Sequence, residues 1–260
     1  MRKLTFTKMH GIGNDYVYVD CFSQQVANPE QLSVRVSDRH KGIGSDGLVL
    51  IMPSSIADFR MRIFNADGSE AKMCGNASRC IGKYVYEHGL TTQTTITLET
   101  LSGIKTLQLQ VNNHEVASVR VNMGKGKTCG NLVQAGTDYL LVDVGNPHAV
   151  CFVDSIADTD VATIGPQVEK AVEGGVNVEF VEVISNSELW LRVWERGSGE
   201  TMACGTGACA AVVAAIHEGY TDSRVVVHLT GGDLSIEQTE DGYIYMTGTA
   251  TEVFTGEILV

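Results

Sequence analysis

Two cysteines of this chain lie in glycine-bearing loops of the same layout. Cys74 is followed by Gly-Asn and Cys204 by Gly-Thr-Gly, and a helical-looking segment comes after each. Such a loop predicts a turn that opens a helix, where backbone N–H groups point outward and the helix dipole adds partial positive charge. A thiol in that position is expected to ionise more easily than an unperturbed one, whose pKa is about 8.5.

The two loops belong to a longer internal repeat. The cysteines are separated by 204 − 74 = 130 residues, half of the 260-residue chain. Three pairs of residues in the segments before the two cysteines match at the same offset: Arg62 with Arg192, Phe64 with Trp194, and Asn65 with Glu195. Gly13-Asn14 and Gly145-Asn146 agree at an offset of 145 − 13 = 132. A solenoid repeats every 20–50 residues or so, so this pattern instead indicates two similar halves that face each other.

A pair of thiols arranged in this way suits inversion at a carbon atom. A carbon that loses a proton on one face and gains one on the other needs two acid/base groups, one deprotonated and one protonated. Cys74 and Cys204 could fill both roles, because a thiol pKa lies close enough to neutrality. Backbone donors after the cysteines could hold a substrate carboxylate and stabilise a carbanionic α-carbon: Gly75, Asn76, Gly205 and Thr206. No cofactor and no metal is needed.

Other interpretations of these residues stay open at this point. Zinc could bind Cys74, Cys80, Cys204 and Cys209, although their spacings exceed those of the usual ligand pairs. A redox dithiol favours Cys-x-x-Cys, which the sequence lacks. Gly11-Ile12-Gly13 could suggest a nucleotide loop, but a strand follows it where that motif needs a helix. His148 could be an idle loop residue, and Asn14, Asn146 and Asn177 could be turn residues. The remaining cysteines are predicted to be small core residues: Cys21, Cys80, Cys129, Cys151 and Cys209.

Composition narrows the class of protein. The net charge is −12 with a pI near 5.0, so no basic stripe is available for nucleic acid. A hydrophobic content of 43% supports packed cores, and the length suits two domains. No apolar run approaches about 20 residues and no signal region follows the N-terminus, so we expect no membrane partner and a cytoplasmic location. Seven cysteines, an odd number, are expected to be reduced thiols in that compartment.

The elements that must position the loops follow the same order in both halves. In the first half we expect strands at 4–10, 16–20, 48–52, 58–65, 95–99, 103–111 and 116–123, with helices at 29–38 and 74–88. In the second half we expect strands at 139–144, 149–153, 177–183, 189–195, 224–229, 234–238, 243–249 and 252–259, with helices at 161–172 and 204–218. The helix after each cysteine, rich in small apolar residues, should be buried. The predicted fold is α+β, with a mostly antiparallel sheet around a central helix in each half.

At these residues the chain resembles the diaminopimelate epimerases. The matching stretches are 6–16, 64–70, 73–76, 145–150, 176–180 and 195–210. The resemblance implies a pyridoxal-independent epimerase that interconverts LL- and meso-2,6-diaminopimelate for lysine and peptidoglycan synthesis. It also implies two pseudo-symmetric halves with the active site between them. The first half, 1–115, would carry Cys74, the second, 116–249, would carry Cys204, and 250–260 would return to the first. The oligomeric state stays open, with a homodimer as one alternative.

The resemblance also implies roles for individual residues. Cys74 and Cys204 would be the paired acid and base, with Cys74 taking the proton from the LL form, and His148 and Glu195 would tune their protonation. The reacting end of the substrate would lie against Gly75, Asn76, Gly205 and Thr206. The rest of the substrate would be held by Asn14, Asn65, Asn146, Asn177, Glu195 and Arg196.

Two departures and several competing hypotheses accompany the resemblance. Ala77 stands where the family usually has glycine, and Gly47 stands where some members carry a substrate-facing glutamine. A proline racemase-like or phenazine isomerase-like relative is an alternative, although the latter proteins lack the cysteine pair. A metal-binding or thiol-redox interaction protein and an inactive scaffold are alternatives of another class.

Overall fold

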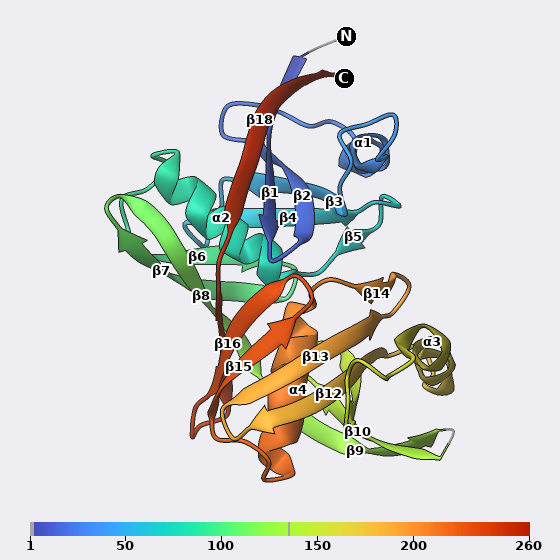
Figure 1. Ribbon diagram of the computed structural model, residues 1–260. Coiled ribbons are helices and arrows are strands. Elements are labelled where there is room, and N and C mark those ends of the chain that lie inside the picture. Colours follow the sequence, from blue (N-terminus) through green and yellow to red (C-terminus); the bar gives the residue numbers. More distant parts are fainter. Residues whose placement is uncertain (1–2, 135) are drawn as a thin grey trace. The chain divides into compact units, whose positions relative to one another are not determined.

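The computed structural model describes residues 3–134 and 136–260 of the chain. Main-chain contacts divide it into two units, and each is described by itself (Figure 1). One unit runs to Val121 and also takes in Gly248–Val260, and the other is Asn122–Thr247.

The first unit is a mixed sheet with two helices. Its elements are β1 (Lys3–Gly11), β2 (Asn14–Asp20), α1 (Pro29–Ser37), β3 (Gly47–Met52), β4 (Phe59–Asn65), β5 (Glu70–Ala71), α2 (Gly75–Glu87), β6 (Thr95–Thr100), β7 (Gly103–Asn112), most of β8 (Glu115–Lys125), and β18 (Thr251–Leu259). The strands pair in the order β18-β1-β2-β3-β4-β6-β7-β8, with β5 also on β4. Only β2–β3 and β4–β6 are parallel among these pairs, and a helix crossover joins each of them, as parallel strands require.

The second unit repeats this order. Its elements are β9 (Lys127–Gln134), β10 (Thr137–Asp143), β11 (Pro147–Phe152), α3 (Val161–Ala171), β12 (Asn177–Ser185), β13 (Glu188–Glu195), β14 (Gly199–Thr201), α4 (Gly205–His217), β15 (Arg224–Leu229), β16 (Gly232–Gln238) and β17 (Tyr243–Gly248). The strands pair in the order β9-β10-β11-β12-β13-β15-β16-β17, with β14 also on β13. The parallel pairs are β11–β12 and β13–β15, the counterparts of those in the first unit. The predicted architecture of two similar α+β halves is confirmed.

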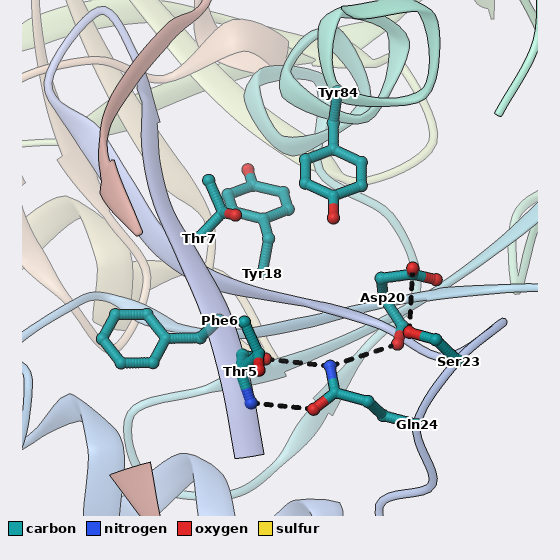
Figure 2. A pocket seen from close by; sticks show the side chains of 8 residues that line it. All are labelled: Thr5, Phe6, Thr7, Tyr18, Asp20, Ser23, Gln24 and Tyr84. Carbon is teal, nitrogen blue, oxygen red and sulfur yellow. Dashed lines mark hydrogen bonds between the residues drawn. The ribbon is translucent and has the colours of Figure 1, made fainter. Parts of the chain in front are cut away.

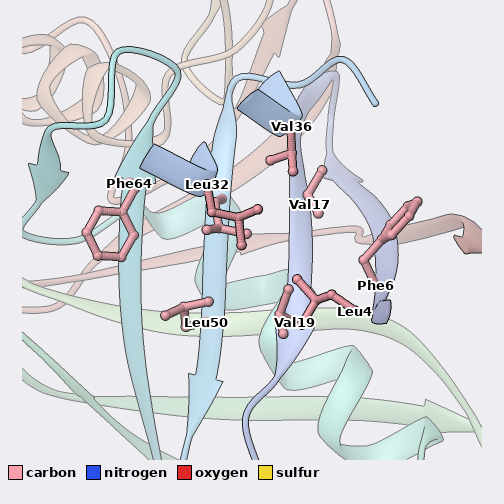
Figure 3. Close-up of a cluster of buried hydrophobic side chains, with 9 residues drawn as sticks. Leu4, Phe6, Val17, Val19, Leu32, Val36, Leu50 and Phe64 are labelled. Carbon is pink, nitrogen blue, oxygen red and sulfur yellow. The ribbon is translucent and has the colours of Figure 1, made fainter. Parts of the chain in front are cut away.

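Helix α1 covers one face of the strands of the first unit. Its Leu32 and Val36 pack on Val17 and Val19 of β2 and on neighbouring strands (Figure 3). Because side chains alternate along a strand, Tyr16 and the other even-numbered residues of β2 point to the opposite face. That opposite face is the one toward helix α2, which packs on β1, β7 and β18.

The second unit uses the same two faces. Helix α3 packs on Val178 and Phe180 of β12, and on Ala149 of β11. Alternation then turns Asn177 and Glu179, with His148 of β11, toward the other face, against which α4 packs. Asn177, Glu179 and His148 therefore lie on the face of the sheet that packs against α4, the helix that Cys204 caps.

Both central helices are buried, as predicted. Ten of the thirteen residues of α4 are buried, and so are ten of the thirteen of α2. Within α2 the fully buried Arg79 donates from Nε to the carbonyl oxygen of Thr249, at 3.1 Å. This bond ties α2 to the segment that leads into β18, which runs beside β1 in an antiparallel pair.

Three strands were not predicted from the sequence. Strands β5 and β14 have only two and three residues, too few for a periodic pattern. Strand β9 is mostly exposed and lacks alternation, because its sequence is Lys-Thr-Cys-Gly-Asn-Leu-Val-Gln. Cys129 lies in β9 and is exposed, so its prediction as a core residue is wrong. Cys80, Cys151 and Cys209 are buried as predicted, and Cys21 is half-buried. Among the described residues, no helix is both long and apolar enough to cross a membrane.

We predict that Gly165→Ala destabilises the second unit. A Cβ there would lie 2.5 Å from Cγ of Trp194, a ring held in place by its 2.7 Å hydrogen bond to Glu169. We expect a loss of about 1–3 kcal/mol in the free energy of unfolding, measured in urea, as is typical of overpacking. Helix propensity alone would predict a gain of about 1 kcal/mol. The control is Gln167→Ala, exposed in the same helix, which should change stability by less than about 0.5 kcal/mol. A Gly165→Ala chain as stable as the unmodified one would contradict the packing.

Candidate active site

An arginine–glutamate pair fixes the hairpin that precedes each cysteine. Arg62 Nε of β4 donates to Oε1 of Glu70 in β5 at 2.7 Å, and Arg192 of β13 makes the same 2.7 Å bond to Glu200 in β14. In the first unit Nη2 of Arg62 also donates to Oε2 of Glu70, at 2.9 Å. In the second unit the antiparallel pairing of β13 with β14 holds the same hairpin. Partly exposed ion pairs contribute little stability, so their value here is to set the path of the chain into the cysteine loop.

Cys74 is the N-cap of α2. Its backbone is extended, with φ −138° and ψ 122°, and its sulfur accepts a hydrogen bond from the N–H of Ala77 at 3.5 Å. The thiol donates to Oδ1 of Asn14 at 3.5 Å, and Nδ2 of Asn76 donates to the same oxygen at 3.3 Å. The other end of the Asn14 amide is fixed as well, because its Nδ2 donates to Asp46 at 2.9 Å. The structure thus brings together Asn14, Cys74 and Asn76.

Cys204 caps α4 in the same way. Its sulfur accepts from the N–H of Gly207 at 3.3 Å and lies 3.4 Å from the hydroxyl of Thr206. That hydroxyl receives a bond from Nδ2 of Asn146 at 3.4 Å, and Oδ1 of Asn146 lies 3.1 Å from Nε2 of His148. A connected chain of four side chains therefore runs from His148 to Cys204.

The first two residues of each helix are placed to bind an anion. Gly75 and Asn76 open α2, and Gly205 and Thr206 open α4. The N–H groups at these positions have no acceptor within their own helix, and the helix dipole adds positive potential. Each cysteine sulfur thus lies next to N–H groups that can hold a carboxylate.

The pKa of Cys204 is opposite to the expectation from the sequence. Burial, then the negative charges of Glu195 and Glu179, raise the pKa of the Cys204 thiol well above its ordinary value. The hydroxyl of Thr206 and the N–H of Gly207 lower this pKa by less. A helix N-terminus favours the thiolate, but two nearby carboxyl groups and the loss of water outweigh it. Cys204 is therefore a thiol at neutral pH.

Glu195, at the end of β13, is a half-buried carboxyl beside Cys204. Its Oε1 accepts from the hydroxyl of Thr201 in β14 at 2.5 Å. Burial raises the pKa of Glu195, and the hydroxyl of Thr201 partly offsets this rise. The charge of Glu195 in turn raises the pKa of Cys204.

Other predicted residues make hydrogen bonds to main-chain or turn groups of their own unit. Oδ1 of Asn177 accepts from the backbone N–H of Arg196 at 3.0 Å, and its Nδ2 donates to Pro147 at 3.2 Å. The guanidinium of the exposed Arg196 donates to the carbonyl of Gly174 at 2.8 Å. Asn65 donates from Nδ2 to Ser69 at 3.0 Å, within the turn after β4, and among the described residues it makes no hydrogen bond to Cys74.

The two departures from the family pattern have physical explanations. At Gly47 a Cβ would collide with the backbone oxygen of Phe64, so no side chain fits there without a shift of the main chain. Ala77 is fully buried and matches Gly207 at the offset of 130, but Gly207 has Glu179 against it. The position that matches Glu179 is the apolar Val49, so the first unit contains no carboxyl there.

Glu179 and Asp46 lie at the site but were not predicted from the sequence. Glu179 is completely buried, and its Oε1 lies 2.7 Å from Nδ1 of His148. A signal for it existed, because a glutamate interrupts the apolar stretch Val176 to Val181 on the same strand face as Asn177. Asp46, in the loop before β3, carried no comparable signal, since loop aspartates are common turn residues.

Within the described residues no cluster of three His, Cys, Asp or Glu side chains suits a metal ion, and none of the seven cysteines, all described, forms a disulfide. A cavity of about 230 Å³ lies between β1, β2 and α2 (Figure 2). Gln24 at its edge bonds both backbone groups of Thr5, at 2.7 and 3.0 Å, so these polar groups already satisfy one another.

Comparison with solved structures defines the class of fold. A phenazine biosynthesis protein of the PhzF family from Bacillus anthracis superposes with a TM-score of 0.79 at 16% identity, with all of both chains covered. A hydroxyproline epimerase from Agrobacterium vitis superposes with a TM-score of 0.76 at 14% identity, over 99% of this chain and 92% of that one. The fold is therefore one that epimerases and phenazine-biosynthesis proteins share.

Sequence comparison is more specific. The family model described as "Diaminopimelate epimerase" matches residues 6–129 and 140–253. A diaminopimelate epimerase from Methanococcus maripaludis is 51% identical over 98% of this chain and 99% of its own length. One from Parabacteroides distasonis is 52% identical over 100% of this chain and 99% of its own length. The chain belongs to the diaminopimelate epimerase family.

We predict that Cys204 reacts as a thiol of high pKa. Iodoacetamide alkylates thiolates, so its rate at Cys204, followed by peptide mass spectrometry, should still be rising above about pH 9. The exposed Cys129 provides a reference in the same chain and should be labelled faster at pH 7. Comparing rates across pH at one site separates ionisation from access. A plateau for Cys204 at or below pH 7 would show that the helix N-terminus outweighs the carboxyl groups.

Proposed function

We propose that this protein epimerises LL-2,6-diaminopimelate to the meso form without a cofactor, in the synthesis of lysine and peptidoglycan precursors. The family membership supports the substrate and the reaction. The observation that carries the chemistry is the equivalent placement of Cys74 and Cys204, each as the N-cap of a buried helix. We also propose the two units as the two domains, while a cytoplasmic location and a homodimer remain predictions.

The two sulfurs divide the acid and base roles according to their surroundings. Cys204 has Glu195 and Glu179 beside it and keeps its proton, which makes it the donor toward the carbanion. The positions that match these two carboxylates in the first unit are the neutral Asn65 and Val49. We therefore assign to Cys74 the role of the base that takes the α-proton from the LL form.

The helix starts serve the reacting end of the substrate. N–H groups of Gly75, Asn76, Gly205 and Thr206 hold the carboxylate on the reacting carbon and stabilise the charge that develops when the α-proton leaves. After the transfer, Cys74 holds the proton it removed, and the Cys204 thiolate retains hydrogen bonds from Gly207 and Thr206.

The remaining predicted residues serve the distal end. A distal amino acid group offers an ammonium and a carboxylate, which suit amide oxygens and a guanidinium respectively. Asn177 and Arg196 are linked by a hydrogen bond and would act together on that end. Asn14 bonds Cys74, and Asn146 bonds Thr206 beside Cys204, so these two amides would lie nearer to the reacting carbon. Asn65 and Glu195 are the last residues of the matching strands β4 and β13.

We predict that Cys74→Ala and Cys204→Ala each remove epimerisation of LL-diaminopimelate. Loss of one acid/base group should lower kcat/KM by about 10²–10⁴-fold or more. The measurement is α-hydrogen exchange in deuterium oxide followed by NMR, with reductant present, starting from each stereoisomer. Single-stereoisomer exchange in one variant would identify the base that remains.

Two comparisons sharpen this experiment. Cys129→Ala, which removes an exposed thiol of β9, should retain the rate of the unmodified protein. Proline offered under the same conditions should not exchange. Full epimerisation by either active-site variant would refute the two-thiol mechanism, and turnover of proline alone would refute the substrate.

A further inference from the structure

A buried carboxyl beside the acid sulfur is only half satisfied. Glu179 has no exposed surface, and its Oε1 bonds Nδ1 of His148 at 2.7 Å. In the described part of the chain no hydrogen-bond donor reaches its other oxygen, Oε2. Leaving a buried polar group without a partner costs stability, and apolar residues are the usual occupants of such a strand. A carboxyl that is retained at this cost is a candidate for a functional role.

Strand register explains why Glu179 meets His148. In the parallel pair β11–β12, His148 stands opposite Asn177 and Val150 opposite Glu179. His148 and Glu179 are thus diagonal neighbours on the face that packs against α4. The carboxylate fixes the orientation of the imidazole, and Nε2 is left to face Asn146.

Because Gly207 has no side chain, Glu179 can lie close to the sulfur of Cys204. A Cβ at Gly207 would lie 2.9 Å from Oε1 of Glu179 and 3.3 Å from Sγ of Cys204. The carboxylate oxygen and the sulfur therefore border the same small space beside the bare α-carbon. A larger residue at position 207 would have to displace one of them.

A second route joins the same two groups through hydrogen bonds. From His148 it passes to Asn146 at 3.1 Å, to Thr206 at 3.4 Å and to the sulfur of Cys204 at 3.4 Å. Glu179 thus acts on Cys204 directly, by its charge, and indirectly, by orienting the chain that ends at the hydroxyl beside the sulfur.

We propose that Glu179 is a positioning residue of this reaction: its carboxylate, oriented by His148, lies beside Cys204 and keeps that sulfur in its protonated, proton-donating form. The inference rests on the proposed function only for the role of Cys204 as the acid. The titratable groups around Glu179 are His148 and Cys151 of β11, Glu195 of β13 and Cys204 at the start of α4. Burial raises the pKa of Glu179, and the charge of His148 and its hydrogen bond lower this pKa by less, so it is the bond to His148 that favours the carboxylate.

The physical effect has a definite sign. A negative charge close to a thiol disfavours the thiolate. The Cys204 thiol then stays loaded with its proton at neutral pH, and a carbanion, a far stronger base, can still take it. Once that proton is on the product, the same charge favours uptake of a proton from solvent by Cys204, while Cys74 releases its own proton to solvent, which resets both sulfurs.

The test is the pH dependence of Cys204 alkylation in Glu179→Gln, followed by peptide mass spectrometry. Glutamine keeps the size and removes the charge, so the midpoint should fall by about one pH unit or more, which is about a tenfold faster alkylation at pH 7. The matched control is Glu182→Gln, on the same strand but on the opposite face, where Glu182 bonds the N–H of Ile156. That variant should leave the midpoint unchanged.

Two further variants keep the test decisive. Glu179→Asp retains the charge and should restore a midpoint near that of the unmodified protein, which a purely structural role would not do. If Glu179→Gln fails to fold, Glu179→Val, which copies Val49 of the first unit, should lower the midpoint in the same direction. A midpoint that is unchanged in a folded, charge-free variant would overturn the proposal.

The outcome can be separated from that of the proposed function. Alkylation needs no substrate, so a protein that fails to epimerise diaminopimelate can still show the shift. In an active protein, the high-pH limb of kcat/KM should also move to lower pH in Glu179→Gln, because a second thiol then ionises sooner. A limb that stays in place while the alkylation midpoint falls would show that Cys204 is not the acid.

Discussion

The structure depends on a sulfur that caps a buried helix. Serine, threonine, aspartate and asparagine are the usual N-caps, and their oxygens stabilise a helix start better than a thiol does. Cys74 and Cys204 nevertheless occupy this position in α2 and α4, and each accepts the N–H three residues later. Burial of both helices supplies the stability that a weak cap does not. In return, each sulfur is held next to N–H groups that have no acceptor in their own helix.

Repetition of the chain gives each unit one cysteine that caps a helix, and the two copies differ in the residues around it. The two units have the same strand order and the same arginine–glutamate pair before the cysteine. The residues that face the cysteine-capped helix do not agree, since Tyr16, Val49 and Asn65 match His148, Glu179 and Glu195 at offsets of 130 to 132. A two-base reaction needs two similar groups in opposite protonation states. Among these matched positions only the second unit has carboxyl groups, Glu179 and Glu195.

Much of this was predictable from sequence, for identifiable reasons. The helices after Cys74 and Cys204 show strong small-residue patterns, and their predicted bounds of 74–88 and 204–218 differ from those observed by single residues at each end. Strand β9 was missed because exposure removes the alternation on which prediction relies. The pKa of Cys204 was predicted with the wrong sign. The helix dipole can be inferred from a local motif, whereas Glu179 approaches the sulfur only through the packing of α4 on β12 at Gly207.

That error in sign shows how a local effect and a tertiary one compete. The partial charge at a helix start acts on any group placed there and is screened by solvent. Cys204 is 5% exposed, so the loss of water both penalises the thiolate and strengthens the effect of nearby carboxyl groups. Burial alone acts in this direction, because it also raises the pKa of Cys80 to about 11 and that of Cys151 to about 12, and neither of these thiols lies at a helix start. Burial and neighbouring charge therefore raise the pKa of Cys204, and the start of α4 fixes where its sulfur lies.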